Sequence, residues 1–119
     1  MMRRRLLAVL RLAVLALAAS AAAPTLALVD LTGVTVIVAG DNHTCAVVGG
    51  AVRCWGENTL GQLGDGTTQS HATPRPVAGI TSAVAVTAGV NHSCALIAGG
   101  TVQCWGSNDS GQLGDGTYN

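Results

Sequence analysis

Four cysteines and two histidines, arranged as two similar groups, are the residues of this sequence best suited to chemistry. They are His43, Cys45, Cys54, His92, Cys94 and Cys104. Thiolate and imidazole are good zinc ligands, whereas two thiols can instead join as a disulfide. No Ser-His-Asp arrangement, phosphate-binding loop or pair of carboxylates stands out elsewhere. We therefore predict no catalytic residue, no cofactor and no enzymatic activity.

The segments around the cysteines have the pattern of β-hairpins. Short runs rich in valine, threonine and alanine flank a Gly-Gly pair at residues 49–50 and an Ala-Gly-Gly turn at residues 98–100. No amphipathic helical pattern follows the first 27 residues, so the fold class is predicted to be all-β. The predicted strands are residues 34–39, 44–48, 51–55, 83–88, 93–97 and 101–105. Residues 68–82, with two prolines, are predicted to be a connection.

The hairpin register decides how the cysteines pair. With the two glycines as the loop, Cys45 faces Cys54 in a non-hydrogen-bonded pair, where Cα atoms lie about 4.5 Å apart. The second hairpin has one more loop residue, and Cys94 then faces Cys104. In an exported protein this geometry favours two disulfides, each closing its own hairpin. Free thiols are the first alternative. A zinc site in each repeat, with His43, Cys45 and Cys54 or with His92, Cys94 and Cys104, is less favoured because no CxxC spacing is present.

The N-terminus has the pattern of a secretory signal peptide. Residues 1–5 are cationic, and residues 6–23 are apolar apart from Arg11 and Ser20. An uncleaved membrane anchor is the alternative, although the apolar run is short for a span of about 20 residues. Both readings predict export to the cell surface, the periplasm or the extracellular space. The predicted cleavage site follows Ala21, Ala23 or Ala27, so residues 1–27 are taken as the leader.

The formal net charge of zero hides two segments of opposite sign. All six basic residues are arginines, and four of them lie in the first 11 residues. Residues 12–119 hold two arginines against six acidic residues, a net charge of −4. Proteins that bind nucleic acids usually carry a basic excess on the binding domain. We therefore predict no nucleic-acid partner, and membrane contact only through an uncleaved leader.

The remainder of the chain is an internal repeat. The hexapeptide at residues 40–45 recurs at residues 89–94, and CWGENTLGQLGDGT at residues 54–67 recurs as CWGSNDSGQLGDGT at residues 104–117. Eleven of the 14 positions in the longer motif are identical. A glycine-rich repeat with a period near 50 is typical of propeller blades or stacked arrays.

These motifs resemble the repeats of the regulator of chromosome condensation family. The resemblance implies a β-propeller, typically of seven blades with four strands each. It covers residues 34–119 and implies about two blades: one full repeat at about residues 50–99 and a partial repeat on either side. The predicted domains are thus the leader, 1–27, and the repeats, 28–119. The motif residues are His43, Trp55, Gly56, Asn58, Gly61, Gln62, Leu63, Gly64, His92, Trp105, Gly106, Asn108, Gly111, Gln112, Leu113 and Gly114.

Positions that are identical in both copies are interpreted as serving the blade itself. The two tryptophans should fill the core between blades, and Asn58 and Gln62 should hydrogen-bond loop backbone. The two histidines are interpreted as hydrogen-bonded packing residues. The two Asp-Gly pairs at residues 65–66 and 115–116 are interpreted as turns, because calcium takes 6–8 oxygen ligands. Binding is expected where the copies differ, in the 68–82 connection and at Arg53, Glu57, Leu60, Gln103 and Asp109.

The favoured function is a non-enzymatic, exported scaffold that binds a protein or a surface glycan. Two blades leave open edges, so the sequence is interpreted as a fragment of a larger propeller, with self-association of the open edges as the alternative. The resemblance also implies a second function, guanine-nucleotide exchange on a small GTPase, as in nuclear members of the family. That function requires a cytosolic or nuclear location, which the leader does not favour.

Overall fold

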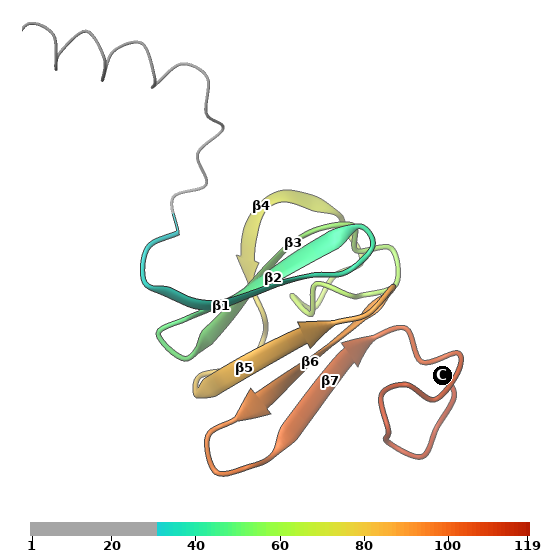
Figure 1. The fold of residues 1–119 in the computed structure, drawn as a ribbon. Helices are drawn as coiled ribbons and strands as arrows, with labels where there is room; N and C mark the ends of the chain where they lie inside the picture. Colours follow the sequence, from blue (N-terminus) through green and yellow to red (C-terminus); the bar gives the residue numbers. More distant parts are fainter. Residues whose placement is uncertain (1–30) are drawn as a thin grey trace, which may run out of the picture.

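A computed structural model describes residues 31–119, which form two antiparallel β-sheets (Figure 1). The all-β prediction is confirmed for these residues, whereas the predicted signal helix and its cleavage sites lie outside them. Within the described part of the chain, no helix is long and apolar enough to span a bilayer. The first sheet contains β1 (Val34–Ala39), β2 (His43–Val48), β3 (Ala51–Gly56) and β4 (His71–Pro76), and the second contains β5 (Ala83–Ala88), β6 (His92–Ile97) and β7 (Val102–Gly106).

The two hairpins have the register that the sequence predicts. Gly49 and Gly50 both have positive φ, 56° and 81°, as a two-residue turn of the I′ type requires. Cross-strand pairing then continues outward to the cysteines in both hairpins. The predicted disulfides are confirmed, with Cα–Cα distances of 4.1 Å in the first hairpin and 4.0 Å in the second. The extra residue of the second hairpin is accommodated in the turn, so the pairing of the cysteines is unaffected.

The prediction that residues 68–82 form only a connection is wrong, because part of this segment is strand β4. Arg75 pairs with Cys54, and Pro76 pairs with Arg53. Prolines lack an amide hydrogen, so Pro74 and Pro76 weaken the strand signal in the sequence. They are tolerated here because β4 lies at the edge of its sheet, where half of the backbone groups have no neighbouring strand.

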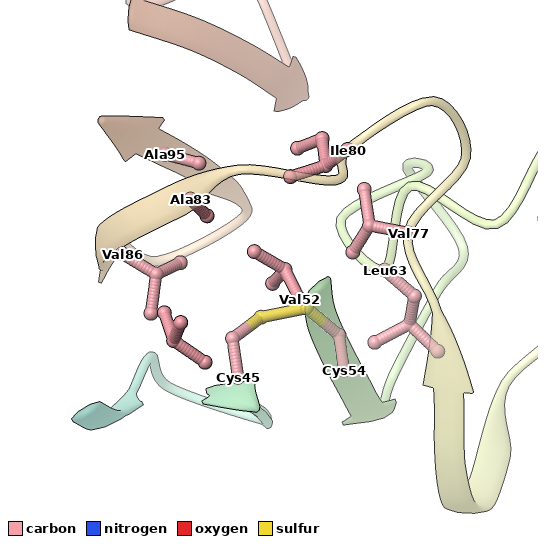
Figure 2. Close-up of a cluster of buried hydrophobic side chains, with 10 residues drawn as sticks. Cys45, Val52, Cys54, Leu63, Val77, Ile80, Ala83, Val86 and Ala95 are labelled. Carbon is pink, nitrogen blue, oxygen red and sulfur yellow. A yellow bond between two sulfur atoms is a disulfide. The ribbon is translucent and has the colours of Figure 1, made fainter. Parts of the chain in front are cut away.

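The hydrophobic core lies between the two sheets rather than within either one (Figure 2). The first sheet contributes side chains from β2 and β3, and the second contributes small side chains from β5 and β6. The connection between the sheets and the loop after β3 close the side of this core. Because a β-sheet must cover its apolar face with another layer, each sheet depends on its neighbour. The buried cluster contains Cys45, Val47, Val52, Cys54, Leu63, Val77, Ile80, Ala83, Val86 and Ala95.

The two disulfides have different surroundings although their sequences are equivalent. Cys45 and Cys54 are completely buried under the second sheet, as Figure 2 shows. Ser93 and Ala95 are buried against the first sheet, so Cys94, which lies between them on β6, is on the opposite face. The second disulfide is accordingly only half-buried.

We predict that removing the first disulfide destabilises the protein more than removing the second. Both double substitutions, Cys45→Ala with Cys54→Ala and Cys94→Ala with Cys104→Ala, lose the loop constraint, which contributes about 2–4 kcal/mol and is smallest for short loops. Only the first pair also leaves a cavity in the core. Urea denaturation of the two variants, compared with the unmodified protein, measures the difference in the free energy of unfolding. Equal losses, or a larger loss for the second pair, would contradict this prediction.

Candidate functional site

The loop that follows β3 is organised around one buried amide side chain. The Asn58 Nδ2 atom donates to Asp65 Oδ1 at 3.1 Å and to the carbonyl oxygens of Thr67 and Gln69 at 3.0 and 2.9 Å. The Asn58 Oδ1 atom accepts from the backbone N–H of Leu63 at 2.9 Å. These bonds satisfy backbone groups that no strand pairs, so the loop has a defined shape without regular secondary structure.

Asp65 completes this loop as an ionised carboxylate. Its Oδ1 atom accepts from the N–H and hydroxyl groups of Thr67 at 3.0 and 2.8 Å, and its Oδ2 atom lies 3.3 Å from the imidazole Nε2 of His71. Desolvation alone would raise the pKa of Asp65, but the hydrogen bonds from Thr67 and Asn58 and the nearby imidazole of His71 outweigh it and lower the pKa. The Asp-Gly pair is thus part of a hydrogen-bonded turn.

The second repeat forms the same loop. The Asn108 Nδ2 atom donates to Asp115 Oδ1 at 3.2 Å and to the Thr117 carbonyl at 3.1 Å, and its Oδ1 atom accepts from Leu113 N–H at 3.0 Å. Hydrogen bonds from Thr117 lower the pKa of Asp115. The sequence did not single out the Asp65–Asn58 contact, although the same spacing of seven residues between Asn108 and Asp115 was a signal that could have identified it.

Four polar residues connect the two sheets, and we call them the joint: His43, Gln62, Ser93 and Trp105. The Gln62 carbonyl oxygen accepts from the Trp105 indole N–H at 2.9 Å and from the Ser93 hydroxyl at 3.2 Å. The His43 Nε2 atom lies 2.8 Å from the Ser93 Oγ atom. The joint therefore attaches β2 and the loop after β3 to β6 and β7.

The joint also explains a glycine in the repeat motif. Gly64 has φ 66°, and a Cβ atom there would lie 2.7 Å from the Trp105 ring. The indole lies against this bare backbone, and a side chain at residue 64 would displace it. The glycine is thus required both by its left-handed conformation and by the close approach of the ring.

The prediction that both tryptophans fill the core between blades holds for only one of them in the described structure. Trp105 packs against the buried cluster between the sheets. Trp55 is half-buried and is not part of that cluster. It follows Cys54 on β3, so alternation along the strand directs it to the face of the first sheet that lies away from the second sheet.

The five predicted binding positions fall into two places. Arg53 pairs with Ala46 and Pro76 in the middle of the first sheet, and Gln103 occupies the same position on β7. Glu57, Leu60 and Asp109 lie in the loops that the buried asparagines organise, where Leu60 and Asp109 are exposed and Glu57 accepts a hydrogen bond from Thr59 at 2.9 Å. The loop positions Glu57, Leu60 and Asp109 are therefore the candidate contact residues, on loops whose backbone is hydrogen-bonded to Asn58 and Asn108.

Residues 31–119 contain no group of three or more histidine, cysteine or acidic side chains arranged to hold a metal ion. The zinc alternative for His43 and Cys45 is also unavailable because Cys45 is bonded to Cys54.

Comparison with known proteins identifies the repeat. The model of the regulator of chromosome condensation (RCC1) repeat matches residues 49–96, and a second model of this repeat matches residues 34–62 and 83–112. The secretion-regulating guanine nucleotide exchange factor of Bos taurus is 43% identical over 68 residues, which are 56% of this chain and 15% of that protein.

Solved structures share the fold. Human WBSCR16 aligns with a TM-score of 0.66 and 27% identity over 76% of this chain and 24% of its own. Yeast RCC1 (Prp20) in its structure with Kap60 aligns with a TM-score of 0.62 and 28% identity over 68% of this chain and 19% of its own. Prp20p from Saccharomyces cerevisiae, whose structure was described together with its binding to Gsp1p and histones, has a TM-score of 0.68 at 22% identity over 78% of this chain and 25% of its own. The chain thus spans a quarter or less of each of these proteins.

We predict that acidification weakens the joint through His43. Desolvation by burial is the main reason that the pKa of His43 lies below its ordinary value of about 6.5; the nearby His92 lowers it further, and Glu57 and Asp41 oppose the shift. Because the unfolded chain binds this proton more readily, the stabilisation is complete above pH 6.5 and declines as the pH falls through the folded-state pKa.

Urea denaturation between about pH 7.5 and pH 5.5 tests this expectation. The free energy of unfolding of the unmodified protein should fall with pH, whereas that of the His43→Gln variant should change less across the same range. An unchanged slope in this variant would assign the pH dependence to other groups.

Proposed function

The chain belongs to the regulator of chromosome condensation (RCC1) repeat family, and from that membership we propose that it forms blades of a protein-binding propeller that promotes guanine-nucleotide exchange on a small GTPase. The observation that carries the proposal is the 43% identity with a guanine nucleotide exchange factor over 68 residues. The chain spans 15% of that relative, so activity, substrate and partner are all parts of the proposal.

The surface proposed to contact the GTPase is formed by the loops after β3 and β7. Their backbones are fixed by Asn58 and Asn108, so little conformational entropy is lost when a partner binds. Leu60, which is 46% exposed, supplies apolar contact area, and Glu57 and Asp109 supply negative charge. Such a surface complements a partner with a basic patch around an apolar contact.

We predict that the 119-residue chain accelerates the release of nucleotide from at least one small GTPase. Members of a GTPase panel are loaded with a fluorescent GDP analogue, and the rate of fluorescence loss is measured with and without the chain. Leu60→Asp should reduce the acceleration by about 10-fold or more, the effect of roughly 1.4 kcal/mol at an interface contact. Thr81→Asp is the matched control, because Thr81 is exposed near the Gly50 turn, at the opposite end of the strands.

If the two substitutions reduced the exchange rate equally, the loops after β3 and β7 would not be the surface that contacts the GTPase. Absence of both exchange and binding across the panel would contradict exchange activity for this chain and leave the second candidate.

The second candidate is an exported, non-enzymatic scaffold that binds a protein or a surface glycan. The specific observation in its favour is the pair of disulfides, because such bonds form and persist in oxidising compartments outside the cytosol. Residues 1–27 are proposed to be the leader that directs the chain there. In this candidate the same loop surface contacts an extracellular partner, and the location of the chain distinguishes the two functions.

We predict that an exported chain loses its leader and contains four oxidised cysteines. Intact-mass measurement of the secreted or periplasmic protein should give an N-terminus immediately after Ala21, Ala23 or Ala27 and a mass four hydrogens below that of the reduced chain. A protein that keeps Met1 and four free thiols in the cytosol would contradict export and favour the exchange function.

A further inference from the structure

The contact between the two sheets is made from residues that each repeat possesses, so the chain carries each half of this contact twice. One half is the face of the first sheet that packs on the second sheet. The other half is the face of the second sheet that packs on the first. The outer face of the second sheet repeats the first half, and the outer face of the first sheet repeats the second half. No residue of the described chain packs on either outer face in the way that the two sheets pack on each other.

The remaining face of the second sheet, which we call the C-face, repeats the buried side of the first sheet. Leu96 and Val102 are the equivalents of Val47 and Val52 and are 39% and 62% exposed, whereas Val47 and Val52 are 2% and 0% exposed. A shallow, largely apolar depression lies on this part of the sheet. The C-face consists of Cys94, Leu96, Val102, Cys104 and Leu113, and residues lining the depression include Ala85, Thr87, Cys94, Leu96 and Val102.

The remaining face of the first sheet, which we call the N-face, repeats the buried side of the second sheet. Val34 and Ile37 are the equivalents of Ala83 and Val86. They are 37% and 63% exposed, whereas Ala83 and Val86 are 5% and 6% exposed within the formed contact. The N-face consists of Val34, Ile37, Thr44, Arg53 and Trp55, together with Ala46, which is already fully buried within the single chain.

The polar joint is also repeated on the two outer faces, where the tryptophan and the glycine that it would contact each lack a partner among the described residues. Trp105 donates to the Gln62 carbonyl and lies on Gly64, where a Cβ atom would be 2.7 Å from the ring. At Gly114, the equivalent of Gly64, a Cβ atom would have no neighbour within 4 Å. The Trp55 indole N–H, the equivalent donor, has no acceptor among the described residues. One described chain therefore has an uncovered glycine, Gly114, on its C-face and a tryptophan without a hydrogen-bond acceptor, Trp55, on its N-face.

We propose that a second copy of this chain covers the C-face with its N-face and repeats in trans the contact that the two sheets already make in cis. The indole of Trp55 of the partner subunit then lies against Gly114 and donates to the Gln112 carbonyl. The occupant is a second copy because this chain carries both complementary halves and its motif repeats are identical at 11 of 14 positions. The two faces differ, so the contact is head-to-tail, and each added copy presents a new C-face or N-face.

This contact differs from the pairing of open strand edges that the sequence predicts. Edge pairing joins backbone groups of β4 or β7 and makes little use of side chains above the sheet. Face packing buries Ile37 of one copy and Val102 of the other, and these two residues are among the most exposed large apolar side chains in the described structure. Ile37 lies on β1, so Ile37→Asp leaves the β4 and β7 edges intact and distinguishes the two modes, whereas Val102 lies on β7 itself.

Sedimentation velocity of the full 119-residue chain over a range of micromolar concentrations tests the proposal. The unmodified chain should form concentration-dependent species larger than a dimer. Val102→Asp places a charge on the C-face, and Ile37→Asp places a charge on the N-face. Each substitution prevents packing at that face, so each variant alone should remain a monomer. Because both side chains are more than 60% exposed, the monomers should keep their fold, which circular dichroism verifies.

A mixture of the two variants provides the sharpest result. The Val102→Asp chain still has an N-face and the Ile37→Asp chain still has a C-face, so an equimolar mixture should form a one-to-one heterodimer that does not grow further. Leu60→Asp is the matched control and should associate like the unmodified chain, because Leu60 and its repeat Ser110 are both exposed outside the contact.

An unmodified chain that is monomeric at all concentrations would overturn the proposal. Association that survives both substitutions would overturn it in favour of edge pairing, and two variants that fail to pair with each other would exclude a head-to-tail contact. The exchange measurement on Leu60→Asp concerns a different surface, so either proposal can fail without the other.

Discussion

The packing of one β-sheet against the next is the constraint on which the rest of this structure depends. Each sheet has three or four short strands with small side chains, and the apolar cluster is formed only where the two sheets meet. The Gln62 carbonyl accepts from Trp105 and from Ser93, so a single backbone atom joins the loop of one repeat to two strands of the next. The motif Trp-Gly…Gly-Gln-Leu-Gly therefore contains the residues that form this contact, and it occurs once in each repeat.

The features that sequence alone predicts are those set by short-range geometry. The Gly-Gly turn and the alternation of β-strands fix the register of the first hairpin, and that register places Cys45 opposite Cys54. The glycine-rich segment after β3 is equally local, because Asn58 forms its hydrogen bonds within 11 residues. For this reason the strands other than β4, the disulfides and the family resemblance could be inferred without coordinates.

The features that sequence did not predict depend on how the two β-sheets are arranged relative to each other. Strand β4 carries two prolines that are compatible with a strand only at a sheet edge, and a sequence pattern does not indicate where the edge lies. Trp55 and Trp105 occupy identical motif positions, yet within residues 31–119 only Trp105 has a sheet on its side. The pairing of His43 with Ser93 links residues 50 positions apart and is visible only once the two repeats are stacked.

The turn of the second hairpin contains one residue more than that of the first, and the pairing of the cysteines is the same in both. The added residue faces solvent at a site where neither the core nor the joint has an atom. Length variation is thereby separated from the buried cluster and from the joint. A gene that grows by duplicating this unit can accumulate insertions at the hairpin tips, so the spacing along the chain drifts while the spacing in three dimensions stays constant.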